Sequence, residues 1–271
     1  MSLGRISGLR CELGESPVWD VSEGRLLLVD IQRRLLYSVR KGALIGAPIG
    51  LSERVTAIVP AERGEWLAVF DRSIGVIDLH TGTVDAVLSI PGDAELVLND
   101  AVSGRDGILY VGSVDRSGAD RGELYAISSR LEVTTVLTGI GASNGLDTTE
   151  GGEKLVHVDS LGDRVSLGID GPAISVPHPD GVAVDAEGYV WVALWGHGQV
   201  HRFDPAGRLD RVLDLPTPLV TNVAFGGADL DELFITTARA DESGLGGAVF
   251  HTRPGVRGLP PAHFRWTLPA A

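Results

Sequence analysis

The chain has 271 residues, a formal net charge of −13, a hydrophobic fraction of 44% and a charged fraction of 22%. These fractions are typical of a chain that buries a large core, and the acidic excess argues against binding to nucleic acid or to an anionic membrane surface. No stretch approaches the roughly 20 apolar residues of a membrane-spanning helix. Cys11 is the single cysteine, which excludes an internal disulfide, and the first ten residues lack the apolar stretch of a signal peptide, so we expect a cytoplasmic protein.

Short apolar runs rich in Val, Ile and Leu recur along the chain, each bounded by Gly, Asp, Asn or Pro. In chain order they cover residues 25–31, 65–70, 108–114, 154–158, 189–194 and 232–237. Runs of this length and composition predict β-strands, and no long helical periodicity competes with them. A strand of small residues precedes each run and an alternating apolar and polar strand follows it, so the repeating unit has about four strands.

The first strand of each unit begins with a comparable five-residue segment. These segments start at Glu15, Val55, Asn99, Asn144, Asp180 and Thr221. Their spacing of roughly 36 to 45 residues is that of propeller blades. The pattern predicts one all-β domain over residues 1–271, a six-bladed β-propeller with four-stranded blades around a central channel. Residues 246–250 would supply the last strand, the amino-terminal segment would close the ring, and the Pro-rich residues 258–263 would form a surface tail.

The first position of these segments should line the channel, and most of its occupants carry oxygen atoms. Glu15 and Asp180 supply carboxylates, and Asn99 and Asn144 supply carboxamides. Oxygen ligands without thiolates favour a hard divalent cation, with Ca²⁺ as the first choice and Mg²⁺, Mn²⁺ or Zn²⁺ as alternatives. Two carboxylates facing each other in a channel are costly unless a cation neutralises them. Each residue alone also fits a plain turn or a surface charge, but four in one register favour a site.

His178 lies two residues before Asp180 and therefore close to the predicted channel mouth. Two interpretations stay open for it. It is either a contact to the substrate or an ordinary loop residue.

Several motifs occur in order along the chain. They are residues 14–19 (GESPVW), 28–31 (LVDI), 143–147 (SNGLD), 158–160 (VDS) and 179–181 (PDG), the last followed by DAEG at 185–188. Together they resemble the regucalcin (senescence marker protein) and gluconolactonase family, and the resemblance runs from about Arg10 to Phe264. It implies a six-bladed propeller with one divalent metal, held by Glu15, Asn144 and Asp180.

The resemblance also implies an activity, which is hydrolysis of a small-molecule lactone. The metal would act as a Lewis acid on the lactone carbonyl, and Asp180 or a metal-coordinated water would be the base, so Asp180 is the candidate catalytic residue. Asn99 would contact the substrate or a metal-coordinated water. Sugar lactonases often carry an Arg two residues before this Asn, where the chain has Val97, and residues 112–114 read Gly-Ser-Val in place of Gly-Thr-Met. Both departures favour a smaller or more apolar lactone over a polyhydroxylated sugar.

Two other readings of the site remain open. The same metal would also suit an isomerase, a cyclase or an esterase of a specialised pathway, because function follows the site rather than the fold. A non-catalytic calcium-binding propeller is the alternative from another class, and a closed metal coordination shell would favour it. The expected partner is a small-molecule substrate, with no nucleic acid and no membrane, and we expect a monomer or a weak homodimer.

Overall fold

A computed structural model of the chain describes residues 2–239 and 244–267. Within these residues the regular structure is β-strand, apart from one turn of 3₁₀ helix, η1 (Glu62–Gly64). No helix in the described residues is long and apolar enough to cross a membrane. The chain forms strands because its short runs are rich in β-branched residues, which pack well on a pleated surface. The glycine-containing turns between the runs permit the chain to reverse direction.

Four sheets have four antiparallel strands each, as the sequence predicts. In chain order their strands are β7 (Val55–Pro60), β8 (Trp66–Phe70), β9 (Ser73–Ile77) and β10 (Val84–Ser89); β11 (Leu96–Ser103), β12 (Leu109–Asp115), β13 (Gly122–Ile127) and β14 (Val133–Ile140); β15 (Ser143–Thr148), β16 (Leu155–Asp159), β17 (Arg164–Leu167) and β18 (Ala173–Ser175); β19 (Pro179–Val184), β20 (Val190–Leu194), β21 (Gln199–Phe203) and β22 (Leu209–Asp214). In each sheet, neighbouring strands are consecutive in the chain, which is an up-and-down meander.

The remaining strands form one nine-stranded sheet in the order β2-β3-β4-β5-β1-β25-β24-β23, with β6 paired to β4. They are β1 (Gly4–Arg10), β2 (Gly14–Asp20), β3 (Arg25–Asp30), β4 (Leu35–Arg40), β5 (Ala43–Leu44), β6 (Ile49–Gly50), β23 (Val220–Gly226), β24 (Glu232–Thr237) and β25 (Ala248–Thr252). A single parallel pair, Ser7 with Ala43, joins its two halves. The strand pairing alone therefore does not separate six sheets. Strand β1 pairs antiparallel with β25, so the amino-terminal segment does complete the last strands.

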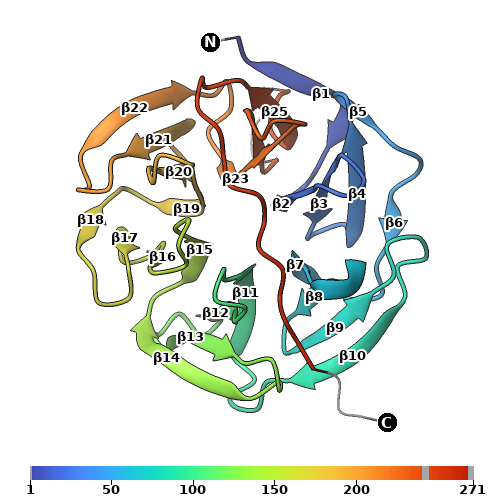
Figure 1. Cartoon of the computed structure of the whole chain (residues 1–271), viewed down its shortest axis with the longest axis vertical. Helices are drawn as coiled ribbons and strands as arrows, with labels where there is room; N and C mark the ends of the chain where they lie inside the picture. Colours follow the sequence, from blue (N-terminus) through green and yellow to red (C-terminus); the bar gives the residue numbers. More distant parts are fainter. Residues whose placement is uncertain (1, 240–243, 268–271) are drawn as a thin grey trace.

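Six strands surround the centre of the molecule. Strand β2 contacts β7, and the contacts continue through β11, β15, β19 and β23 back to β2, which gives the closed ring seen in Figure 1. Each of the six has a register shift near its start, and the shifts lie between residues 15 and 18, 55 and 57, 98 and 101, 143 and 146, 179 and 182, and 220 and 222. A bulge redirects the side chains beside it. The recurring bulge thus shapes one end of the channel.

The core is divided among the interfaces between neighbouring sheets. One cluster packs Val69 of β8 with Val111 of β12, and another packs Val165 of β17 with Val192 of β20. Because a four-stranded sheet cannot bury both of its faces alone, each interface depends on the sheet on either side. The ring of sheets therefore holds the inner strands, and the bulges on them, in a fixed arrangement.

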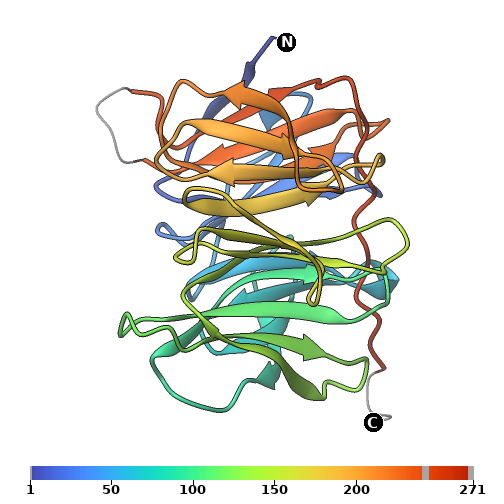
Figure 2. The same cartoon turned by 90° about the vertical axis from the view of Figure 1, so that its left-hand side faces the viewer.

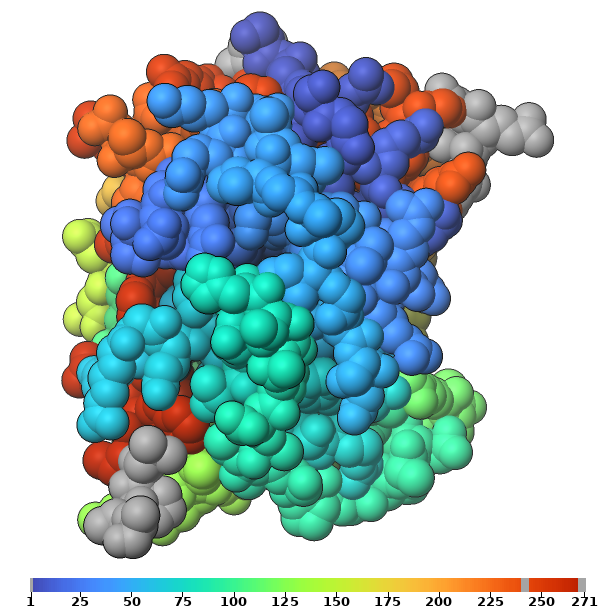
Figure 3. All heavy atoms as spheres, turned by 90° about the vertical axis from the view of Figure 1, so that its right-hand side faces the viewer, coloured from blue at the N-terminus to red at the C-terminus, as the bar shows by residue number. Residues whose placement is uncertain are grey.

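The chain after β25, residues 253–267, crosses one face of the ring, and we call it the strap. Figure 1 shows this red segment passing over the centre, and Figure 2 shows it along one face. Gly258 bridges to Asp185 and Phe264 bridges to Ala61, and the Phe264 side chain is completely buried. In Figure 3 the red atoms lie against the cyan atoms of the sheet formed by β7 to β10. Residues 258–263 lie at the surface, as expected, and the buried Phe264 that follows them anchors the segment to the ring.

Candidate active site

The starts of the inner strands surround a cavity of about 280 Å³ at one mouth of the channel. The downstream parts of the same strands enclose a second hollow, which the strap residues Leu259 to Ala262 cover. Five residues that the sequence singled out line the first cavity, namely Glu15, Asn99, Asn144, His178 and Asp180. The structure thus brings all of the predicted site residues together, and their individual roles stay predictions.

Glu15 is fixed by the bulge of β2. Its Oε2 accepts hydrogen bonds from Asn222 Nδ2 at 3.1 Å and from the backbone N–H of Ser16 at 3.3 Å. Ser16 has a φ of 47°, which is uncommon for a residue other than glycine, and its Oγ accepts from Ile58 N at 2.9 Å on the adjacent inner strand. The next strand therefore holds the strained turn that presents the Glu15 carboxylate.

Both carboxamides are held by their nitrogen ends. Asn99 Nδ2 donates to the backbone oxygen of Ser143 at 3.1 Å, and Asn144 Nδ2 donates to Ser160 Oγ at 3.2 Å. Ser160 Oγ in turn donates to the backbone oxygen of Pro179 at 2.5 Å. Since these bonds use the amide nitrogens, the carboxamide oxygens are the atoms left to meet a cation or a donor from a substrate.

Asp180 is the most unusual group in the cavity. Its side chain is 6% exposed, and its Oδ1 has no hydrogen-bond partner in the described part of the chain. A buried carboxylate oxygen without a partner is costly, and native proteins contain few of them. The oxygen lacks a compensating donor or cation from the protein itself, which points to a ligand.

The carboxylates of the channel raise one another's pKa values. Burial, followed by the charge of Asp100, raises the pKa of Glu15 to about 8. Burial, then the charges of Glu15 and Asp100, raises the pKa of Asp180 well above its usual value, although a hydrogen bond from Asn144 opposes this. Burial also raises the pKa of Asp147, deeper in the channel, to about 6. A divalent cation would reverse the local balance, because an opposite charge nearby favours ionised carboxylates.

The donor set fits a hard cation. Within residues 2–239 and 244–267, no three His, Cys, Asp or Glu side chains form a metal-binding group. A cation here would therefore need the oxygens of Asn144 or Asn99 in addition to those of Glu15 and Asp180. Mixed carboxylate and carboxamide oxygens are ligands that Ca²⁺ accepts. The unpartnered Asp180 Oδ1 supplies the independent observation that the residues fit such an ion.

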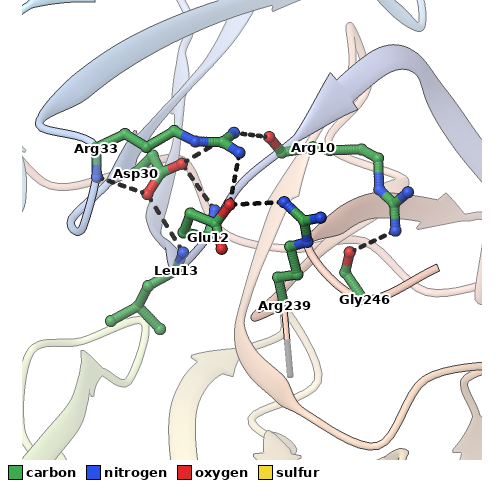
Figure 4. Close-up of polar contacts among 7 residues, drawn as sticks. All are labelled: Arg10, Glu12, Leu13, Asp30, Arg33, Arg239 and Gly246. Atoms are coloured by element: carbon green, nitrogen blue, oxygen red, sulfur yellow. Dashed lines mark hydrogen bonds and ion pairs between the residues drawn. The ribbon is translucent and has the colours of Figure 1, made fainter. Parts of the chain in front are cut away.

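A completely buried carboxylate holds the backbone just before Glu15, as Figure 4 shows. Asp30, at the end of β3, accepts from the backbone N–H of Glu12 at 2.8 Å and of Leu13 at 3.2 Å. Its Oδ1 also accepts from the N–H of Arg33 at 3.1 Å. The VDI motif thus fixes the approach of the chain to Glu15.

The third sheet repeats the arrangement. Asp159, at the end of β16, accepts from the backbone N–H of Gly141 at 3.3 Å and of Ala142 at 3.0 Å. These residues lie just before Asn144, as Glu12 and Leu13 lie just before Glu15. The two carboxylates therefore hold the segments that lead into two candidate ligands.

His178 lies at the rim with a left-handed backbone, φ 43°. Its backbone N–H donates to Asp163 Oδ1 at 2.7 Å, and its ring stacks on His197 with the centroids 5.8 Å apart. The side chain is 63% exposed. It can reach a molecule in the cavity, and both interpretations of His178 stay open.

Alignment of the strand openings missed residues that contact Glu15 or line the cavity. Thr221 shares the register of Glu15, but it is completely buried and its Oγ1 donates to the backbone oxygen of Gly14 at 2.6 Å. The bulge of β23 skips Thr221, so Asn222 takes the place beside Glu15. Arg54 and Trp195 also line the cavity, from just before β7 and just after β20. No sequence pattern marked them, because they lie outside the aligned openings.

The chain was compared with protein families and with known structures. The sequence model of the SMP-30/gluconolactonase/LRE-like region matches residues 13–239. The chain belongs to this family. A pentonolactonase, XacC of Haloferax volcanii, is 33% identical over 91% of this chain and 89% of its own length. Regucalcin of Oryctolagus cuniculus is 28% identical over 93% of this chain and 94% of its own length.

Solved structures share the fold of this family member. A luciferin-regenerating enzyme superposes with a TM-score of 0.87 at 24% identity, covering 97% of this chain and 99% of its own. A calcium-binding regucalcin from Agrobacterium tumefaciens superposes with a TM-score of 0.86 at 24% identity, covering 97% of each chain. At this identity the superpositions establish the propeller fold and carry no information about the substrate.

Proposed function

We propose that this family member is a divalent-metal-dependent hydrolase that opens a small-molecule lactone. The observation that carries the proposal is the unpartnered, buried Oδ1 of Asp180 in one cavity with Glu15 and Asn144. The lactonase names of relatives, among them the pentonolactonase and a putative sugar lactone lactonase of Bacillus subtilis, support the reaction type. We also propose that each half of the nine-stranded sheet is a blade, so that the ring of six inner strands belongs to a six-bladed propeller.

Glu15, Asn144 and Asp180 would hold the cation, and Ca²⁺ is the ion that their oxygens fit best. When bound, the cation supplies Lewis acidity to the lactone carbonyl. The metal preference belongs to the proposal, as does the catalytic role of Asp180.

The chain's own residues would handle the proton. Water adds to the lactone carbonyl carbon while Asp180 accepts one of its protons. The bond between the carbonyl carbon and the ring oxygen then breaks, and that oxygen takes up the proton, so the product is the open hydroxy acid. Burial and the neighbouring carboxylates favour the protonated form of Asp180 in the metal-free protein, and a cation beside it would favour the ionised form that the base step needs. Asn99, held by Ser143, would orient the substrate through its carboxamide oxygen.

The test is hydrolysis of a lactone panel, from aldonolactones to alkyl γ- and δ-lactones, by metal-stripped protein with Ca²⁺, Mg²⁺, Mn²⁺ or Zn²⁺ restored singly. Asp180→Asn is expected to lose turnover, and Glu15→Gln is expected to lose metal binding measured by calorimetry. Asp20→Asn is the matched control, because Asp20 is a buried, hydrogen-bonded carboxylate outside the cavity.

Two outcomes would count against the proposal. Asp180→Asn protein that keeps both the metal and full turnover would remove Asp180 from the reaction. Tight metal binding without turnover on any lactone would favour a different metal-assisted reaction or a structural ion.

A further inference from the structure

The polar groups of the cavity occupy only part of its wall. The rest of the wall is formed by the apolar residues Leu13, Ile31, Leu161, Pro179 and Trp195. Arg54 is the only Lys or Arg among the described residues that line the cavity. Its Nη1 lies 2.7 Å from Asp71 Oδ1, so its charge is already paired. Asp180 is 6% exposed whereas Leu161 and Trp195 are exposed, so the buried base of the cavity contains a carboxylate and part of its rim is apolar.

Trp195 differs from every other tryptophan of the chain. It is 38% exposed, whereas Trp19, Trp66, Trp191 and Trp266 are all between 0% and 9% exposed. Leu161, which lines the same cavity, is 67% exposed. Covering apolar surface of this size with a ligand is favourable, because it removes the surface from water. The exposed indole and leucine thus form an apolar wall that is left without a cover from the protein.

The apolar wall is held in place by the backbone. The backbone N–H of Trp195 donates to the backbone oxygen of His178 at 3.0 Å, and Trp195 also forms a β-bridge with Leu219. Leu161 follows Ser160, whose N–H donates to the backbone oxygen of Ala142 at 3.0 Å. A Cβ at position 141 would come within 2.7 Å of Leu161 Cβ, so Gly141 lets Leu161 approach the neighbouring strand. Binding at a fixed wall avoids the entropy cost of ordering it.

The apolar wall offers no hydrogen-bonding side-chain group other than the indole N–H of Trp195. Val97, two residues before Asn99, is 5% exposed and does not line the cavity. Hydroxyl groups placed against Leu161 would gain no hydrogen-bond partner from it, whereas an alkyl group would gain apolar contact there.

From these observations we propose that the cavity is a subsite for lactones that carry an alkyl or aryl substituent. The substituent packs on Trp195 and Leu161, and the carbonyl end of the ring points to the base of the cavity. The proposal rests on the proposed lactonase function and names the substrate class for it.

The first measurement is the selectivity ratio, kcat/KM for γ-nonalactone divided by kcat/KM for γ-butyrolactone, in the full-length protein. Trp195→Ala and Leu161→Ala are each expected to lower this ratio by about tenfold or more, because contact with a few methylene groups gives discrimination of that size. Trp195→Phe is expected to restore most of it. Leu209→Ala is the matched control, because Leu209 is a 54% exposed leucine on β22 outside the cavity.

The second measurement does not depend on turnover. An alkyl-substituted γ-lactam, which resists hydrolysis, is titrated while tryptophan fluorescence is recorded. We expect the emission to shift to shorter wavelength as Trp195 becomes covered, and the shift to be absent in Trp195→Ala. A wild-type preference for glucono-δ-lactone, or a selectivity ratio unchanged in both cavity variants, would overturn the subsite. A lactam-induced shift without turnover of any lactone would keep the subsite and reject the lactonase.

Discussion

The buried carboxylate of Asp30 offers the sharpest test of how the fold positions the proposed metal. Asp30→Asn replaces one carboxylate oxygen by an N–H₂ group, which then faces at least one of the three backbone N–H groups that Asp30 binds. Losing one charged hydrogen bond and leaving a buried donor unpaired costs about 2 kcal/mol of folding free energy. Because Glu12 and Leu13 lead directly into Glu15, the same change should also loosen the Glu15 carboxylate.

We expect Asp30→Asn to weaken Ca²⁺ binding by about tenfold, which corresponds to about 1.4 kcal/mol. Binding is measured by calorimetric titration with Ca²⁺, and stability by urea unfolding of the metal-free protein.

The control is Asp20→Asn at the other end of the same strand pair. Asp20 accepts from Ser22 Oγ at 2.7 Å, from Glu23 N at 3.2 Å and from Arg25 Nε at 3.0 Å. The Asp20→Asn protein should therefore lose a similar amount of folding free energy and keep the Ca²⁺ affinity of the wild type. Equal affinities in the two variants at equal loss of stability would refute the positioning argument.

Further predictions concern stability. Burial lowers the pKa of His157 from 6.5 to about 4, so the folded state disfavours its protonation. Its contribution of about 3 kcal/mol is present above pH 6.5 and is lost as the pH falls toward 4. His157→Gln should flatten this part of a plot of unfolding free energy against pH, and an unchanged slope would contradict the assignment. A Cβ on Gly112 would collide with the Ser143 side chain next to Asn144, so Gly112→Ala should cost about 1–3 kcal/mol in urea unfolding, and wild-type stability would argue against the collision. Phe264→Ala should cost about 3–5 kcal/mol, because the ring is completely buried, and a smaller loss would show that the strap is weakly docked. Ca²⁺ at 100 times its Kd should stabilise the protein by about 2.7 kcal/mol, and EDTA should reverse this in a thermal melt; a melt that ignores both would count against the metal.

The repeat positions of the inner strands could be predicted from the sequence because they depend on local pattern. Glu15, Asn144 and Asp180 stand at the starts of regularly spaced apolar strands, and the fold converts equal register into spatial proximity. The contact of Asn222 with Glu15 could not be predicted, because the bulge of β23 moves the register by one residue from the aligned position Thr221. A one-residue shift in a strand changes which side chain faces the channel. The position of Trp195 depends on contacts between loops that are distant in sequence. No periodic pattern in a single sequence predicts such contacts.

The anchoring of the strap could not be predicted for a related reason. Its prolines indicate a segment outside the sheets, which is correct, but burial of Phe264 depends on a core cluster built mainly from strands far earlier in the chain. Local composition cannot report such a partner. The nine-stranded sheet could not be predicted either, because the pairing of Ser7 with Ala43 that joins its two halves is a contact between segments distant in sequence.

The pairing of β1 with β25 also has a consequence for how the protein is made. Gly4 pairs with His251, so strand β1 finds this partner only after all of the strands between them have been synthesised. Until then the nascent ring has an open seam with unpaired edges, which are templates for association with other chains. Contacts between residues so distant in sequence also form slowly. Closure of the ring should therefore be a late event in folding, and the interval before it is when a newly made chain is most exposed to aggregation.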